Sequence, residues 1–189
     1  GWTEEQSAGA YKLKKRNDNA LFGFNSTAQS WKKFIHPPSQ NLWHAKNDGG
    51  KTVFTPESLD KQKIALLGVR SCDLQAIGIL DKVFISSPFT DSAFKSRRSN
   101  LLIIGMNCTI AGGTCFCASM GTGPGIDSGY DILLTEMIEK NRHYFVAEKG
   151  TPLGGEIMKE IPSAEANIYE LEGVEKGIDR AASEMTKKV

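Results

Sequence analysis

The four cysteines of this chain, Cys72, Cys108, Cys115 and Cys117, all lie within one quarter of its 189 residues. Cysteine thiolates bind soft metal ions and iron–sulfur clusters, and four are the number that a tetrahedral zinc site or a cubane cluster needs. Their spacing differs from the C-x2-C pairs of zinc ribbons and from the C-x2-C-x2-C run of bacterial ferredoxins. From spacing alone, a metal site and an ordinary role as buried thiols remain equally open.

The strands that we expect around these cysteines bring them together. One aliphatic run, at 64–69, ends just before Cys72, and a second, at 101–107, ends at Cys108. Such runs are typical of parallel strands that are buried on both faces. Because ligands collect outside the carboxyl ends of strands in open α/β sheets, we expect Cys72 to meet the loop that begins at Cys108.

That loop, 109–125, is rich in glycine, too irregular for a helix or strand and too apolar for a disordered linker. Cys115 and Cys117 alternate about Phe116, so both side chains point to one side of an extended segment, which favours a shared ligand. The stretch 121–125 matches neither the Walker A motif nor the dinucleotide fingerprint, and turn formation is its expected role. Of the four cysteines, Cys108 is the best candidate for a purely structural thiol.

Cys72 has a second interpretation, as a reactive thiol. The start of a helix and the nearby Arg70 would both stabilise its thiolate. A nucleophile also needs a base, and the three histidines, His36, His44 and His143, are all distant in sequence. Five further charged residues flank the site in sequence, and we interpret them as ion pairs that hold the connecting helices: Asp73, Asp81, Asp91, Arg97 and Arg98.

Composition restricts the class of protein. With 40% hydrophobic residues the chain can bury a substantial core, and its net charge of +1 gives no field that would recruit nucleic acid or anionic lipid. No apolar run reaches the length of a membrane span, and the first residues do not resemble a signal peptide. We therefore expect a cytoplasmic protein, in which reduced, clustered cysteines favour metal or redox chemistry over disulfides.

The order of expected elements predicts an α/β fold, with a mixed α+β arrangement as the alternative. We expect a single domain, 1–189, with a β-rich part at 1–60, an α/β core at 61–150 and a helical segment at 151–189. The expected elements are hairpins at 11–24 (turn at 17–19) and 42–54 (turn at 47–50), strands at 64–69 and 101–107, an antiparallel pair at 130–137 and 143–148, and helices at 26–35, 73–83, 91–96, 157–161 and 174–189.

Several segments carry a resemblance to a known family. They are Gly68-Val69-Arg70-Ser71-Cys72-Asp73-Leu74, Asp81-Lys82-Val83-Phe84, Arg97-Arg98, Asn107-Cys108, and Cys115-Phe116-Cys117-Ala118-Ser119-Met120-Gly121-Thr122-Gly123-Pro124, together with the earlier segments 21–24, 30–34 and 36–38. These segments resemble the β subunit of cytosolic sulfhydrogenases. The A subunit of anaerobic sulfite reductase belongs to the same group of proteins, which contain a 4Fe-4S dicluster domain.

The resemblance implies an iron–sulfur electron-transfer subunit rather than a catalytic one. Such subunits relay electrons between a flavin/NAD(P)-binding subunit and a hydrogenase or sulfite reductase catalytic subunit. It also implies that the chain is a fragment, because a ferredoxin-like part should follow a helix such as 173–189. On this basis Cys72, Cys108, Cys115 and Cys117 are the expected ligands of an additional [4Fe-4S] cluster. The alternatives are a cluster-free docking or scaffold domain, a thiol enzyme, and a zinc site.

Overall fold

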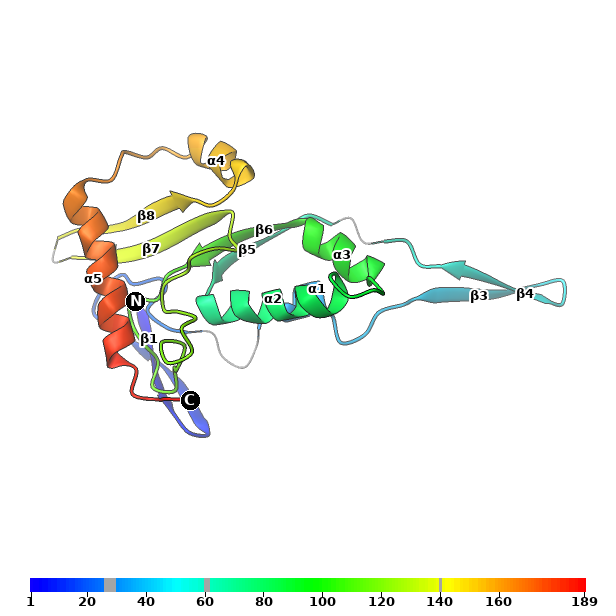
Figure 1. Cartoon of the computed structure of the whole chain (residues 1–189), viewed down its shortest axis with the longest axis horizontal. Coiled ribbons are helices and arrows are strands. Elements are labelled where there is room, and N and C mark those ends of the chain that lie inside the picture. The colour runs from blue at the N-terminus through cyan, green and yellow to red at the C-terminus, as the bar shows by residue number, and fades with distance from the viewer. Residues whose placement is uncertain (26–29, 60–61, 140) are drawn as a thin grey trace.

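The structure is a computed structural model that describes residues 1–25, 30–59, 62–139 and 141–189 (Figure 1). None of the described helices is long and apolar enough to cross a membrane. Along the chain the elements are β1 (Trp2–Ser7), β2 (Ala10–Lys15), α1 (Lys32–Ile35), β3 (Trp43–Asp48), β4 (Lys51–Pro56), β5 (Ile64–Val69), α2 (Ser71–Phe84), α3 (Ser92–Ser99), β6 (Leu101–Met106), β7 (Ile132–Ile138), β8 (His143–Lys149), α4 (Pro152–Lys159) and α5 (Ile168–Glu184).

The central sheet has four strands in the order β5-β6-β7-β8. Strands β5, β6 and β7 run parallel, and β8 returns antiparallel to β7. Helices α2 and α3 connect β5 to β6, as a parallel crossover requires. This arrangement confirms the predicted α/β class with a β-rich N-terminal part, and the antiparallel edge makes the sheet a mixed one.

The hydrophobic core lies between the first parallel strands and the helices that join them. Its side chains are almost completely withdrawn from water, which for a large aliphatic or aromatic side chain contributes about 1.5–3 kcal/mol. The core residues are Ile35, Leu66, Val69, Ile77, Phe94 and Ile103. Helix α1 therefore joins the core through Ile35, although most of its other residues are exposed.

The first hairpin was predicted too late in the chain. Strands β1 and β2 pair from Trp2↔Lys15 to Ser7↔Ala10 through a turn in which Gly9 has a φ of +76°. A two-residue turn needs this left-handed conformation, and glycine adopts it without strain. The predicted turn at 17–19 instead follows β2, where Arg16 and Asp18 form an ion pair with atoms 2.6 Å apart. The hairpin was missed because β1 is largely polar and lacks a clear alternation.

The second hairpin was predicted correctly. Strands β3 and β4 pair from Trp43↔Pro56 to Asp48↔Lys51, and the turn residues Gly49 and Gly50 both have positive φ. Every residue of the two strands is exposed. Figure 1 shows this hairpin as an arm that extends away from the central sheet.

The last two helices begin earlier than predicted. Their N-terminal capping residues set the start of each helix, whereas the prediction used the hydrophobic pattern. The side chain of Thr151 accepts a hydrogen bond from Gly154 N, so α4 starts at Pro152. Asn167 and Glu170 form a capping box, which starts α5 at Ile168. Helix α5 ends at Glu184, short of the predicted 189. Of the predicted helix at 26–35, residues 26–29 lie outside the described part of the chain.

Candidate cysteine site

The site is built where two neighbouring parallel strands end. In β5, the register against β6 shifts between Leu67 and Val69, and Gly68 at this bulge has a φ of +86°. A side chain at Gly68 would collide with the ring of Phe22, since its Cβ would lie 2.8 Å from a ring carbon. The bulge therefore permits a close contact with the N-terminal segment just before the chain enters α2.

The glycine-rich loop folds back onto its own beginning. Cys108 N donates a hydrogen bond to the carbonyl of Pro124 at 3.3 Å, so the two ends of the loop meet. Within it, Thr122 N donates to the carbonyl of Cys117 at 3.0 Å, and the hydroxyl of Ser71 donates to the carbonyl of Thr122. The tail of the loop is therefore bound to the first residue of α2, directly beside Cys72.

Gly123 shows how tightly the loop and helix approach each other. A Cβ at this position would lie 2.8 Å from Ser71 Oγ and 3.1 Å from Cys117 Sγ. Only glycine fits such a gap without displacing its neighbours. The contact places Cys117 near the start of α2, in agreement with the expectation that Cys72 meets the loop that begins at Cys108.

Each of the four thiols has a raised pKa. Burial, together with the negative charges that Asp73, Cys108 and Cys115 can carry, raises the pKa of Cys72 to about 11. Cys72 keeps an exposed surface, yet its sulfur is sufficiently surrounded by protein to lose much of its hydration. Burial is also the main cause of the raised pKa of Cys108, Cys115 and Cys117.

The same shifts reveal which thiols interact. Cys108 is affected by Cys117 and Cys115, while Cys117 is affected by Cys115 and Cys72. Each thiol therefore lies within electrostatic range of at least one other, and together they form one connected group. Opposing these effects, the positive charge of Arg70 lowers the pKa of both Cys108 and Cys115.

The four thiols are of the kind that binds an iron–sulfur cluster, but the described part of the chain does not bring them into a ligating arrangement. Thiols that are poorly hydrated and close to a glycine-rich loop are the ligands that such clusters use. Within the described ranges, no three His, Cys, Asp or Glu side chains are arranged so as to hold a metal ion. The assignment of Cys72, Cys108, Cys115 and Cys117 as ligands therefore stays a prediction.

The alternative of a reactive thiolate at Cys72 is not supported. An activated thiol needs a lowered pKa, whereas that of Cys72 is raised. The histidines are engaged with other groups: His36 stacks on Phe84 with ring centroids 4.7 Å apart, His44 Nε2 lies 2.6 Å from Glu57, and His143 Nε2 lies 2.8 Å from Glu136.

The predicted ion pairs are present in part. Arg98 Nε lies 3.1 Å from the carboxylate of Asp81, which ties α3 to α2. Asp91 instead caps α3 by accepting a hydrogen bond from Phe94 N at 2.8 Å. Arg97 donates to the carbonyl of Ile35 at 2.7 Å. The side chain of Asp73 accepts from the hydroxyl of Ser30 at 3.2 Å.

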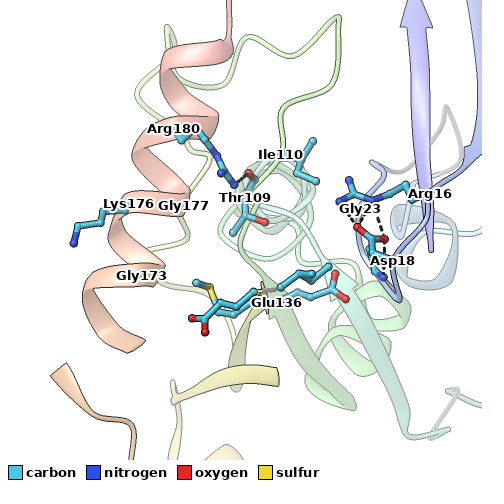
Figure 2. Close-up of a pocket in the computed structure, with 14 residues that line it drawn as sticks. Arg16, Asp18, Gly23, Thr109, Ile110, Glu136, Gly173, Lys176, Gly177 and Arg180 are labelled. Atoms are coloured by element: carbon cyan, nitrogen blue, oxygen red, sulfur yellow. Dashed lines mark hydrogen bonds and ion pairs between the residues drawn. The ribbon is translucent and has the colours of Figure 1, made fainter. Parts of the chain in front are cut away.

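A cleft of about 720 Å³ opens beside the start of the cysteine loop (Figure 2). Thr109 lines it, and the guanidinium of Arg180 on α5 points toward the carbonyl of that residue, 3.3 Å away. Its charged groups are largely paired: Arg16 with Asp18, and Lys176 with Glu172. The cleft was not predicted from the sequence, because residues from four separate segments form it.

Two further side chains lie beside the cysteines, and the sequence analysis did not identify them. Met185, at the end of α5, places its sulfur 3.7 Å from Cys117 Sγ. The side-chain oxygen of Asn25 lies 3.7 Å from Cys108 Sγ. Neither belongs to a pattern that marks a site, and only the fold brings them to the cysteines.

The fold and site thus define an α/β protein with a group of interacting thiols at the carboxyl ends of its parallel strands. Over 75 residues the chain is 45% identical to sulfhydrogenase 2 subunit beta of Pyrococcus furiosus. The match covers 40% of this chain and 22% of that protein. No family model and no solved structure matches the chain. The similarity supports, over part of the chain, the resemblance to sulfhydrogenase β subunits that the sequence motifs indicated.

Proposed function

We propose that this chain is part of an iron–sulfur electron-transfer subunit of a hydrogenase-like complex. The observation that carries the proposal is the group of four neighbouring thiols at the carboxyl ends of the parallel strands, in a chain similar to a sulfhydrogenase β subunit. Cys72, Cys108, Cys115 and Cys117 would hold a [4Fe-4S] cluster. Such a cluster takes up and releases single electrons at a potential that its surroundings set.

The chain's own residues would supply these surroundings. Cys72 lies in the first turn of α2, where unpaired backbone N–H groups favour negative charge. The loop offers further N–H groups, and the sulfur of Met185 lies 3.7 Å from Cys117 Sγ. Hydrogen bonds to thiolate sulfurs are a usual means by which proteins adjust cluster potentials.

The partners follow from the same proposal. The chain would act in the cytoplasm between a flavin/NAD(P)-binding subunit and a catalytic subunit, a hydrogenase or a sulfite reductase. The catalytic chemistry would then belong to another subunit, and this chain would be a non-catalytic component of an oxidoreductase. In this proposal residues 1–189 form a single domain.

Iron and acid-labile sulfide per chain test the cluster, together with visible and EPR spectra of protein purified without oxygen. We expect about four irons and four sulfides. Each of the four single Cys→Ser variants should lose most of the iron while Ser119→Ala, a change in the same loop, should keep it. Equal iron content in wild type and in all four Cys→Ser variants would show that these cysteines are not the ligands.

A cluster-free docking domain is the second candidate, favoured by the exposed hairpin. By the register of β3 and β4, Trp43, Ala45, Phe54 and Pro56 lie on one face, and all four are exposed. Exposed apolar surface of this kind marks sites of protein contact. Protein that folds normally but binds neither iron nor sulfide after anaerobic reconstitution would favour docking over electron transfer.

A further inference from the structure

The cleft beside the start of the cysteine loop is large enough to hold a small organic molecule (Figure 2). Its volume of about 720 Å³ falls within the range of roughly 300–1,000 Å³ that is typical of ligand pockets. Four segments line it: the stretch that follows β2, the first residues of the cysteine loop, the end of β7, and α5. None of the described residues that line it is a cysteine, so a role for the cleft does not depend on a cluster.

Part of the lining is apolar. Ile110, Met137 and Ile138 contribute to it and keep accessible surface, and Ile138 is 39% exposed. On the facing side of α5, Gly173 and Gly177 line the cleft without a side chain. A Cβ at Gly173 would lie 3.1 Å from Met137 Cε, so a larger residue there would push the helix away from β7. The cleft therefore offers an apolar contact to a ring or a hydrocarbon group.

The acidic side chains of the lining are bound to other groups of the protein. Glu136 is 7% exposed, and two backbone N–H groups donate to its carboxylate. Both oxygens of Asp18 accept hydrogen bonds from Arg16. Glu139 accepts from the hydroxyl of Tyr144 at 2.8 Å. These carboxylates therefore have little remaining capacity to accept hydrogen bonds from a ligand.

Two arginines of the lining keep N–H groups for a ligand, since a guanidinium has five donors. Arg180 is exposed, and within the described part of the chain its side chain donates one hydrogen bond, to the carbonyl of Thr109 at 3.3 Å. Arg16 uses Nε and Nη2 for Asp18, and its Nη1 has no hydrogen-bond partner among the described residues. In Figure 2 the two guanidinium groups lie on either side of Thr109 and Ile110. The donors that remain in the cleft are therefore cationic.

We propose that the cleft binds a small molecule that carries a phosphate group on an apolar, ring-containing body, and that Arg180 contacts the phosphate. A phosphate monoester has close to two negative charges at neutral pH, and guanidinium groups bind it through charge-assisted, often paired hydrogen bonds. Two arginines match such a charge better than the single charge of a carboxylate. The apolar body would lie against Ile110 and Ile138.

A water-filled crevice is the competing explanation. In that case α5 simply packs imperfectly against β7 and the cysteine loop, and Arg180 is an exposed side chain that holds the loop through Thr109. Removal of the arginine would then affect stability at most. Binding of a phosphate monoester, compared with its neutral ring and with phosphate alone, separates the two explanations.

The test is an NMR titration of the protein with naphthyl phosphate, with naphthol and with inorganic phosphate. The amide signals of Thr109, Gly173 and Gly177 report on the cleft, because these residues line two of its walls. We expect naphthyl phosphate to move these signals and to bind at least about tenfold more tightly than either naphthol or inorganic phosphate. Naphthyl phosphate that leaves them unmoved at millimolar concentration, or that binds no more tightly than naphthol, would overturn the proposal.

Arg180→Gln tests the contact with the phosphate. It should weaken the binding of naphthyl phosphate at least about tenfold and leave that of naphthol unchanged. Arg142→Gln is the matched control, because it removes an exposed arginine that pairs with Glu170 and does not line the cleft. Equal affinity of the two variants for naphthyl phosphate would contradict the role of Arg180. If Arg180→Gln does not fold, the comparison of the three probes on the wild type decides the proposal. Because the proposed cluster is measured by iron and sulfide content, either proposal can fail without the other.

Discussion

Glu136 and Arg70, two buried side chains of opposite charge, hold the backbone of one residue from its two sides. Phe22 N donates to the carboxylate of Glu136 at 2.8 Å, while the carbonyl of Phe22 accepts from Arg70 at 2.7 Å. The carboxylate also accepts from Leu21 N at 2.6 Å and lies 2.8 Å from His143 Nε2. The segment around Phe22 is thus hydrogen-bonded both to Glu136 on β7 and to Arg70, the residue that precedes α2.

We expect Glu136→Gln to lower the free energy of unfolding by about 2–4 kcal/mol, measured by urea denaturation. An amide cannot accept from both Leu21 N and Phe22 N, because its NH2 group faces one of these donors. Glu172→Gln removes an exposed carboxylate that pairs with Lys176, and should change stability by less than about 1 kcal/mol. A loss below 1 kcal/mol in Glu136→Gln would show that the segment is held mainly by other contacts.

The central sheet was predictable from the sequence because its strands are continuous apolar runs between polar residues. The strand at 64–69 matches β5 to the residue, and α2, α3, β6, β7 and β8 were each placed to within a few residues. Because β5 and β6 run parallel, their carboxyl ends lie at the same edge of the sheet. The expectation that Cys72 and the loop that begins at Cys108 meet at this edge was therefore correct. Local hydrophobic patterns predict the strands, and the general rule that ligands collect at the carboxyl ends of parallel strands predicts the shared edge.

What the sequence did not predict depends on contacts across the chain. Arg70 was visible only as a neighbour of Cys72, and its three carbonyl partners come from two other segments. Glu136 lies in an apolar strand, where nothing in the local pattern shows that it binds the backbone 115 residues earlier. The raised pKa of Cys72 likewise follows from burial, which outweighs the helix start that favoured a thiolate.

Gly123→Ala should destabilise the cysteine loop. The added methyl group would lie 2.8 Å from Ser71 Oγ and 3.1 Å from Cys117 Sγ, so the loop must move away from α2. We expect a loss of about 1–3 kcal/mol and weaker retention of iron under a chelator. Gly78→Ala is the control, since nothing lies within 4 Å of its Cβ, and there alanine should add about 0.5–1 kcal/mol to the stability of α2. Equal behaviour of the two variants would contradict the close loop–helix contact.

In reduced, metal-free protein, Cys72 should react slowly with iodoacetamide near neutral pH. A thiol whose pKa is about 11 has about a hundredfold less thiolate at pH 8 than one with the ordinary value of 9.0. Peptide mass spectrometry after timed alkylation at pH 7–11 measures this, with the unfolded chain in urea as the control. The raised pKa also favours folding below about pH 9, and this contribution is lost as the pH rises toward 11. Rapid alkylation at pH 7 would restore the thiol-enzyme alternative.

The exposed hairpin should contribute little to the stability of the sheet. Trp43 is 62% exposed and Phe54 is 66% exposed, on the same face of an arm that extends from the sheet. Because neither side chain is buried in the core, Trp43→Ser and Phe54→Ser should each change the free energy of unfolding by less than about 1 kcal/mol. Ile77→Ala, in the core of α2, should cost about 2–5 kcal/mol. A loss of that size at Trp43 or Phe54 would mean that the arm folds back onto the body in solution, and would remove the observation that favours docking.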